Sequence, residues 1–321
     1  MSSNPKPVLL YYSMLKFQPS TMGLLRRYFR VESIPDPSCD TPSLLAEVEI
    51  LFAPLGYKTD RFKIDCCPKL KVIASNTTGH PHIDVDYAQS VGIQVVTLKE
   101  DHEFLATITP TAELTWGLVI ALTRNIIPGF SSVKKGNWNR RNFGGARMLS
   151  RMYLGIVGYG RLGKMVGQYG LSAGMQVGFF DPFVEDAPNI RKHETLRDLV
   201  RTADVVTLHV PHEKGTENLI DKSIFSEFRP GSYFVNTARG ELVDHQALLG
   251  ALVDGRLSGA ALDVIENEFD PGFKVKQNPL WDYAIAHTNL ILTPHIGGST
   301  EDAWEATEHQ TIKKIVSTLG K

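Results

Sequence analysis

The sequence predicts an α/β fold made of two doubly wound parallel-sheet domains. Short apolar runs alternate with segments of helical period, the runs fall into two series, and one long helical segment separates the series. Runs that are apolar on both faces and separated by helices are typical of parallel strands, and right-handed crossovers then place helices on both faces of each sheet. The 321 residues suffice for about two domains of ~150 residues.

The strands of each series can be placed from these apolar runs. We expect the first series at residues 8–12, 48–53, 70–75 and 93–97, with helices at 21–29 and 84–91. We expect the second series at residues 153–157, 177–180, 205–210, 233–236, 260–264 and 290–292.

A long helix is expected at residues 109–125, between the two series. Thr109 can cap it, Pro110 suits its first turn, and Glu113 favours its positive end. The segment 134–151 that follows carries six basic residues and no acidic one. We interpret it either as a solvated loop or as a subunit contact or part of a charged cleft.

Composition restricts the partners and the compartment. Lys and Arg number 34 against 35 Asp and Glu, so no general affinity for nucleic acid or anionic membranes is expected. The apolar runs are shorter than the ~20 residues of a membrane span, and the N-terminus does not resemble a signal peptide. Cys39, Cys66 and Cys67 do not have the spacing of zinc ligands, so we expect no metal site. We expect free thiols without a catalytic role, which suit the reducing cytoplasm.

The strongest local motif is a glycine-rich turn directly after the strand predicted at 153–157. Gly158 permits a tight turn, Gly160 lets the backbone approach a pyrophosphate, and Gly163 lets the following helix pack closely on the strand. Asp181 follows the next strand, 181 − 163 = 18 residues after the last glycine. The pattern predicts a dinucleotide site, although a lone glycine turn with an incidental aspartate would look the same.

Asp181 also favours one cofactor over its phosphorylated form. A carboxylate there accepts hydrogen bonds from ribose hydroxyls and repels a 2′-phosphate. Pro182 and Phe183 follow it, and no arginine is present to receive such a phosphate. The sequence therefore favours NAD over NADP.

Charged residues follow three of the predicted strands of the second series. Arg239, Glu268 and His295 come after the strands expected at 233–236, 260–264 and 290–292. A guanidinium can bind a carboxylate through two hydrogen bonds, an imidazole can exchange a hydroxyl proton, and a carboxylate can orient that imidazole. This set suits hydride transfer on a 2-hydroxy acid. Considered alone, Arg239 would be interpreted as a surface salt-bridge partner, Glu268 as a solvated loop residue and His295 as a turn residue.

Taken in order, the motifs resemble the D-isomer-specific 2-hydroxyacid dehydrogenase family over nearly the whole chain. The motifs are GYGRLG at 158–163, Asp181, LHVP at 208–211, NTARG at 236–240, ALDV at 261–264 with NEF at 267–269, and TPHIGG at 293–298. The resemblance implies that Arg239, Glu268 and His295 are catalytic. It also implies a Rossmann NAD-binding domain at 109–293 and a flavodoxin-like substrate domain at 1–108, completed by 294–321, with the active site in a cleft between them.

The resemblance further assigns binding residues and an assembly. Asp263 would hold the nicotinamide carboxamide, and the backbone of the loop after the strand at 70–75 would bind the substrate carboxylate. The implied assembly is a homodimer through the NAD-binding domain. The implied NAD contacts are Thr78, Thr111, Gly158, Gly160, Arg161, Leu162, Gly163, Asp181, Val210, Thr237, Ala238, Asp263, His295 and Gly298. The implied substrate contacts are Asn76, Thr77, Thr78, Gly79, Arg239 and His295.

The loop at 75–84 departs from the family pattern. Thr77 stands where a glycine is common, and Pro81 and His82 stand in place of an acid and an amide. These changes suggest a substrate with a polar or anionic tail, although His80 and His82 can equally be structural. A separate set of basic residues outside this loop could bind a phosphate or phosphonate. These residues are Lys58, Arg61, Lys99 and His102.

The acidic motif also departs from the pattern. Phe269 replaces the proline that usually follows the catalytic glutamate, Pro271 comes shortly after, and Glu266 is an alternative partner for the histidine. The chain ends soon after its last helical segment, so we expect no serine-binding regulatory domain.

Two further readings stay open beside an NAD-dependent dehydrogenase. One is formate or phosphite oxidation on the same fold, although formate enzymes of this fold pair the histidine with a glutamine. The other is an NAD(H)-sensing binding protein that resembles a transcriptional corepressor. The sequence specifies neither the hydroxy acid nor the physiological direction.

Overall fold

The computed structural model describes residues 5–80, 82–270 and 272–320, so Pro81 and Pro271 lie outside the described residues. The chain divides into two compact units: Met1–Ile108 with Ser299–Lys321, and Thr109–Gly298. The second unit therefore interrupts the first in sequence. The return to the first unit comes at Ser299, slightly later than the residue 294 expected from the sequence.

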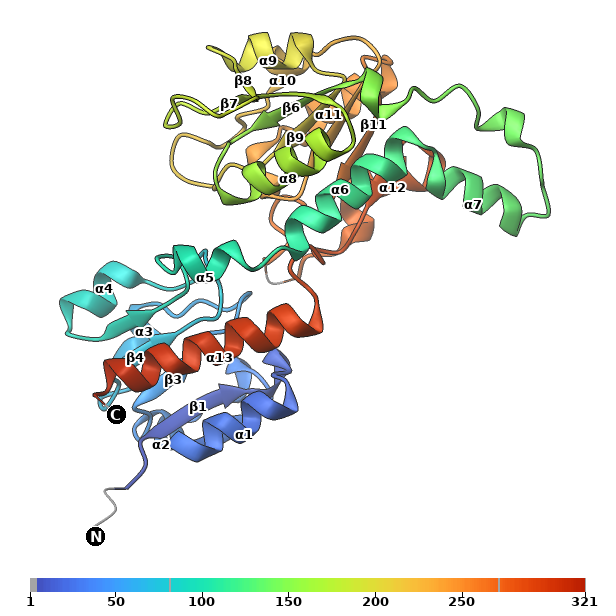
Figure 1. Cartoon of the computed structure of the whole chain (residues 1–321). Coiled ribbons are helices and arrows are strands. Elements are labelled where there is room, and N and C mark those ends of the chain that lie inside the picture. The colour runs from blue at the N-terminus through green and yellow to red at the C-terminus, as the bar shows by residue number, and fades with distance from the viewer. Residues whose placement is uncertain (1–4, 81, 271, 321) are drawn as a thin grey trace. The chain divides into compact units, whose positions relative to one another are not determined.

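The first unit contains a five-stranded parallel sheet in the order β2-β1-β3-β4-β5. Figure 1 labels β1, β3 and β4 of this sheet. Its strands are β1 (Val8–Tyr12), β2 (Arg30–Ile34), β3 (Ile50–Phe52), β4 (Val72–Ala74) and β5 (Gln94–Val96). Its helices are α1 (Pro19–Tyr28), α2 (Pro42–Leu45), α3 (Arg61–Asp65), α4 (Val85–Ser90), α5 (His102–Ala106) and α13 (Glu301–Thr318). This strand order is that of flavodoxin-like sheets.

Each face of this sheet packs on a different set of helices, because successive strand residues point to opposite faces. Leu9 and its same-face neighbours pack on α1 and α13, where Ile312 and Ile315 are fully buried. Leu10 and its same-face neighbours pack on α2, α3 and α4, and this side also buries Cys67. Cys39 and Cys66 are exposed and, like Cys67, are not in disulfides.

A buried carboxyl group connects α13 to α1. Glu308 is 2% exposed and its Oε2 accepts a hydrogen bond from the Gln18 backbone N–H at 3.0 Å. Burial raises the pKa of Glu308 above its usual value. The folded protein therefore binds this proton more tightly than the unfolded chain, and Glu308 stabilises the fold less as pH rises above the unfolded pKa.

Glu308→Gln should consequently become more stable relative to the parent protein as pH rises from 4 to 7. The glutamine oxygen can still accept the Gln18 hydrogen bond but carries no charge. Single substitutions of this kind change the free energy of unfolding by about 1 kcal/mol, which urea titrations at each pH resolve. The exposed Glu301→Gln is the matched control and should show no such trend. If the free energies of unfolding of Glu308→Gln and of the parent protein differed by the same amount at every pH, the assignment would be contradicted.

The second unit contains a seven-stranded sheet in the order β12-β11-β10-β9-β6-β7-β8, with every strand pair parallel. Its strands are β6 (Tyr153–Val157), β7 (Gln176–Phe180), β8 (Arg191–Lys192), β9 (Val205–Leu208), β10 (Ser232–Asn236), β11 (Leu257–Leu262) and β12 (Leu290–Leu292). Its helices are α6 (Pro110–Thr123), α7 (Ile126–Lys134), α8 (Arg161–Ser172), α9 (Leu196–Thr202), α10 (Lys222–Phe225), α11 (His245–Val253) and α12 (Pro279–Ala286). The strand order reverses between β6 and β9, where doubly wound sheets bind ligands.

Helices cover both faces of this sheet as well. The side chains of α6 and α8 share one core with β6 and β7, and those of α9 to α12 form the core on the opposite face. Short 3₁₀ turns complete the two units at Ser13–Leu15, Pro37–Cys39, Arg140–Asn142, Leu149–Arg151, Gly240–Leu242 and Val275–Gln277.

Three details differ from the sequence prediction. The edge strands β2 and β8 were not predicted, because β2 is half exposed and β8 has only two residues. Thr109 does not cap α6: its backbone is helical, and its hydroxyl donates to the Glu113 carboxylate instead of accepting a backbone N–H.

The basic segment is anchored to the second unit at one end. Arg147 lies 2.5 Å from Asp204, which Arg229 also contacts at 2.8 Å. The preceding helix α7 contains no buried residue, and it extends away from the sheet with the loop that follows it (Figure 1, green).

One stretch, His102–Thr123, meets the length and hydropathy criteria for a membrane span. In the structure it comprises two helices, α5 and α6, and 39% of the apolar window is buried. Ala112 and Val119 of α6 are fully buried in the core of the second unit. Core helices pass the same test, so this stretch is weak evidence for a membrane segment.

Candidate active site

The carboxyl ends of β10, β11 and β12 are aligned side by side. Asn236, Leu262 and Leu292 are the last residues of these strands, and they are paired partners in the ladder. Arg239 and His295 each follow three residues after their strand, and Asp263 follows one residue after its strand. The parallel register therefore brings all three loops to one edge of the sheet.

His295 is held at one ring nitrogen by Glu268. The distance between His295 Nδ1 and Glu268 Oε1 is 2.8 Å, and the side chains are 31% and 14% exposed, respectively. Glu266 instead lines a separate polar hollow of about 390 Å³ beside Asp244 and His245. Of the two glutamates considered from the sequence, Glu268 is the one that contacts the imidazole.

Asp263 organises the loop that carries His295. Its Oδ1 accepts hydrogen bonds from Thr293 Oγ1 at 2.6 Å and Ile296 N at 2.9 Å, and its Oδ2 accepts one from Gly297 N at 2.7 Å. Asp263 is 1% exposed. His295 itself has φ +52°, a left-handed conformation that costs energy for a residue with a β-carbon. We infer that these three hydrogen bonds hold this backbone in place.

Arg239 lies in a turn that is closed by Asn236. The Asn236 side chain accepts from Ala238 N at 2.9 Å and donates to Arg239 O at 2.8 Å. Gly240 has no room for a β-carbon, which would lie 2.1 Å from the Glu266 backbone nitrogen. The arginine turn and the glutamate loop are therefore in backbone contact. Among the described residues the guanidinium donates to Ala238 O at 2.6 Å, which leaves most of its five N–H groups for a ligand.

The glycine-rich turn has the geometry of a phosphate site. A β-carbon on Gly158 would lie 2.7 Å from His209 O, and one on Gly163 would lie 2.1 Å from Gly158 O. Gly158 also has φ +88°, which favours glycine. A β-carbon on Gly160 would meet no atom within 4 Å, so this side of the α8 N-terminus is open to an anion. The residues present therefore fit a dinucleotide pyrophosphate.

Asp181 closes the same turn. Its Oδ2 accepts from Tyr159 N and its Oδ1 from Phe183 N, both at 2.8 Å, and the residue is 9% exposed. A carboxylate has about four acceptor sites, so both oxygens can still accept from ribose hydroxyls.

The remaining residues implied for NAD in the second unit lie on α6 and α8 and in the loops after β9, β10 and β12. Thr237 Oγ1 lies 2.7 Å from Thr115 Oγ1, whose hydroxyl also bonds to the Thr111 carbonyl. Val210 contacts the position that a Gly158 β-carbon would occupy. Burial lowers the pKa of Arg161 from its ordinary value. Leu162 and Ala238 are half-buried, and Gly298 is exposed.

The first-unit loop at 76–79 is braced by its own hydroxyls. Thr77 Oγ1 lies 2.8 Å from Ser75 Oγ and donates to Gly79 O at 2.6 Å, while Thr78 is exposed. His82 is 7% exposed, and burial lowers its pKa to about 4, so it is neutral at pH 7. The Thr77 hydroxyl is thus used within the loop. It does not support the polar-tail subsite suggested by the sequence, and neither does the neutral, buried His82.

Two of the four basic residues considered for a phosphate site have other neighbours. Arg61 lies over the Tyr87 ring, 4.5 Å from its centroid, and His102 Nε2 lies 3.8 Å from Glu100. Lys58 and Lys99 are exposed.

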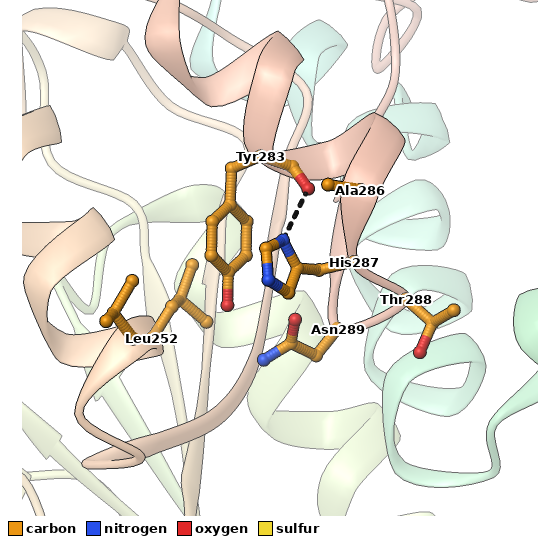
Figure 2. A pocket seen from close by; sticks show the side chains of 7 residues that line it. Leu252, Tyr283, Ala286, His287, Thr288 and Asn289 are labelled. Atoms are coloured by element: carbon orange, nitrogen blue, oxygen red, sulfur yellow. Dashed lines mark hydrogen bonds between the residues drawn. The ribbon is translucent and has the colours of Figure 1, made fainter.

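The second unit contains a further hollow, whose lining includes none of Arg239, Glu268 and His295. It measures about 520 Å³ and is lined by Leu252, Val253, Tyr283, Ala286, His287, Thr288 and Asn289 (Figure 2). Thr288 and Asn289 precede β12, so the hollow adjoins the amino end of that strand, opposite to His295. In the described ranges, no group of three or more His, Cys, Asp or Glu side chains is arranged to hold a metal ion.

The fold and the strand-end groups define a dinucleotide-binding α/β protein. More particularly, the chain belongs to the D-isomer specific 2-hydroxyacid dehydrogenases, since residues 116–297 match the NAD binding domain of that family. The predictions of family, fold class and NAD as cofactor are therefore confirmed.

Individual relatives support this membership. A D-3-phosphoglycerate dehydrogenase of Methanocaldococcus jannaschii is 34% identical over 86% of this chain, which spans only half of that protein's length. A hydroxypyruvate reductase of Thermotoga maritima is 31% identical over 86% of this chain and 87% of its own length. A D-lactate dehydrogenase from Aquifex aeolicus, solved with NAD and lactic acid, superposes with a TM-score of 0.82 at 28% identity. That superposition covers 98% of this chain and 95% of the other.

The sequence did not predict the supporting roles of three residues of the site, although Asp263 and Asn236 belong to its motifs. Asn236 closes the arginine turn, Asp263 anchors the histidine loop, and Glu241 Oε1 accepts from Asn267 N at 3.2 Å. The available signal was a polar residue directly at a buried strand end, which Asn236 and Asp263 both provide.

Proposed function

We propose that this protein interconverts a D-2-hydroxy acid and its 2-keto acid with NAD as the hydride acceptor or donor. The observation that carries the proposal is the Glu268–His295 hydrogen bond beside the Arg239 turn, in a domain of this family. A formate enzyme would carry glutamine in place of Glu268.

Each of the three side chains has a chemical role in the proposal. Arg239 binds the substrate carboxylate with its free N–H groups and polarises the adjacent carbonyl. With Nδ1–H donated to Glu268, His295 Nε2 accepts the hydroxyl proton in oxidation and returns it in reduction. The Glu268 carboxylate keeps this tautomer and stabilises the imidazolium. When bound, NAD supplies the acceptor for the hydride that leaves C2.

The test measures NADH oxidation against a panel of 2-keto acids. The panel contains glyoxylate, hydroxypyruvate, pyruvate, phenylpyruvate, 3-phosphohydroxypyruvate and phosphonopyruvate. Turnover that His295→Ala abolishes would support the proposal, and the preferred acid would identify the substrate class. Absence of turnover with NADH still bound would favour the sensing protein, or formate or phosphite chemistry.

We further propose that the 76–79 loop binds the substrate carboxylate. Lys58 and Lys99 would bind any anionic tail of the substrate. Lys58→Ala and Lys99→Ala should then raise KM for 3-phosphohydroxypyruvate by about 2- to 5-fold each, because exposed charge pairs contribute up to ~1 kcal/mol. KM for pyruvate serves as the internal control. Equal KM changes for both substrates would remove this assignment.

Asp181 is proposed to bind the adenine ribose and to exclude a 2′-phosphate. Asp181→Asn should reduce the preference of kcat/KM for NADH over NADPH at least ~10-fold, since the substitution removes a like-charge repulsion of several kcal/mol. The exposed acid Asp186, in the same loop, gives the control variant Asp186→Asn. An unchanged cofactor ratio in Asp181→Asn would contradict the role.

We also propose a homodimer formed through the second unit and a cytoplasmic location. The helix α7 and the loop that follows it support the dimer, since they expose three large apolar side chains: Phe130 is 63%, Trp138 89% and Met148 64% exposed. Contact with a second copy would remove such side chains from water. Sedimentation of the parent protein and of Phe130→Asp tests the assembly, with a shift from dimer to monomer expected.

The three free thiols suit a reducing compartment.

A further inference from the structure

The His295 imidazole contacts an aromatic ring as well as the Glu268 carboxylate. The residue after Glu268 is Phe269, and its ring centroid lies 5.3 Å from that of the imidazole, with the planes tilted by 51°. This separation lies within the range of direct aromatic contacts. The loop 267–269 thus contacts one imidazole through two successive side chains, a carboxylate and an aromatic ring.

The contact restricts how the imidazole can move. The His295 backbone is fixed by hydrogen bonds from its N–H to the Asp263 carbonyl at 2.9 Å and the Thr293 carbonyl at 3.0 Å, so only side-chain rotation can displace Nε2. Rotation toward Phe269 is opposed by the ring.

This arrangement is a property of the present chain. The family pattern has proline at position 269, and a proline ring is smaller and has no aromatic face. Phe269 is 42% exposed, so a large apolar side chain is kept in contact with water while one part of it touches His295.

We propose that Phe269 is a positioning residue that holds the His295 imidazole in the orientation required for proton exchange. This inference rests on the proposed function, because it acts through His295. Phe269 does not exchange a proton itself. Its ring limits rotation of the imidazole.

The kinetic test compares Phe269→Ala, Phe269→Leu and Phe269→Tyr. We expect kcat about 10-fold lower in the alanine and leucine variants, and within 2-fold of the parent protein in the tyrosine variant, which keeps the ring. The Kd of NADH and the Tm should stay unchanged. Phe273→Ala, which removes a partly exposed ring of the same loop, is the control and should leave kcat unchanged.

A second measurement does not depend on turnover. In histidine-labelled protein, the His295 ring signal is assigned by its loss in His295→Gln. The assigned signal should be a single sharp resonance in the parent protein and in Phe269→Tyr, and should shift and broaden in Phe269→Leu. An unchanged signal and unchanged kcat in Phe269→Leu would overturn the proposal, and so would a fall in kcat that is matched by weaker NADH binding and a lower Tm. If the parent protein turns over no keto acid, the proposed function fails while the resonance still decides the role of Phe269.

Discussion

Replacing His295 by glutamine is expected to lower kcat for the preferred 2-keto acid by a factor of about 10²–10⁴, the usual contribution of a general acid–base. The substitution removes the Nε2 that exchanges the proton and leaves the Asp263 hydrogen bonds of the loop in place. Steady-state NADH oxidation measures the loss. NADH fluorescence should give a Kd within about 2-fold of the parent protein, because the proton-exchanging atom is not a phosphate or ribose contact.

The neighbouring Glu268 provides the internal comparison for this result. Glu268→Gln keeps a hydrogen-bond acceptor for Nδ1 but no charge to stabilise the imidazolium. We therefore expect a smaller loss of kcat than in His295→Gln, and a double variant that is no slower than His295→Gln alone. Additive losses in the double variant would show that the two residues do not act as one unit.

Arg239→Lys is expected to have the second-largest effect. Lysine keeps the positive charge but lacks the planar fork that binds a carboxylate through two parallel hydrogen bonds. Truncating one partner of a close charge pair costs about 2–5 kcal/mol, which corresponds to ~30- to 5,000-fold in kcat/KM. The loss should appear in the KM of the keto acid as well as in kcat, since Arg239 both binds and polarises the substrate.

Chemical rescue separates this role from a structural one. Arg239→Ala should recover part of its activity when guanidinium is added at millimolar concentration, because the turn is closed by the Asn236 side chain and by backbone groups. Asn236→Ala, which opens the turn, should not be rescued. Equal rescue of both variants, or of neither, would argue against Arg239 as the carboxylate-binding group.

The sequence predicted most of the sheet architecture because buried parallel strands are continuous apolar runs. The glycine-rich turn could also be predicted from the sequence. Gly158 and Gly163 have no space for a β-carbon, so the turn requires glycine at these positions. The strand β2 was missed for the opposite reason: Arg30–Ile34 is an edge strand whose side chains are exposed or half-exposed. Thr109 fits the composition of a cap, but its hydroxyl forms a bond to Glu113 instead.

The details of the site depend on tertiary contacts that sequence spacing does not encode. Asp263 is satisfied by three donors about 30 residues away in the chain, so its role in the loop follows only from the pairing of β11 with β12. The direction of the Phe269 side chain likewise depends on a loop in which Asn267 has φ +60°. The Thr77 hydroxyl suggested a polar substrate tail, yet it bonds within its own loop, and that pairing could not be predicted from the sequence.

The interruption of the first unit by the second has a consequence for biosynthesis. The helix α13 supplies Ile312 and Ile315 to the core of the first unit, yet it is translated after all of Thr109–Gly298. On the ribosome, the second unit can therefore complete its core while the part of the first sheet that α13 covers stays exposed. Uncovered apolar surface makes nascent chains prone to aggregation. The first unit, although its synthesis starts first, thus obtains its last core helix only after the second unit has been made.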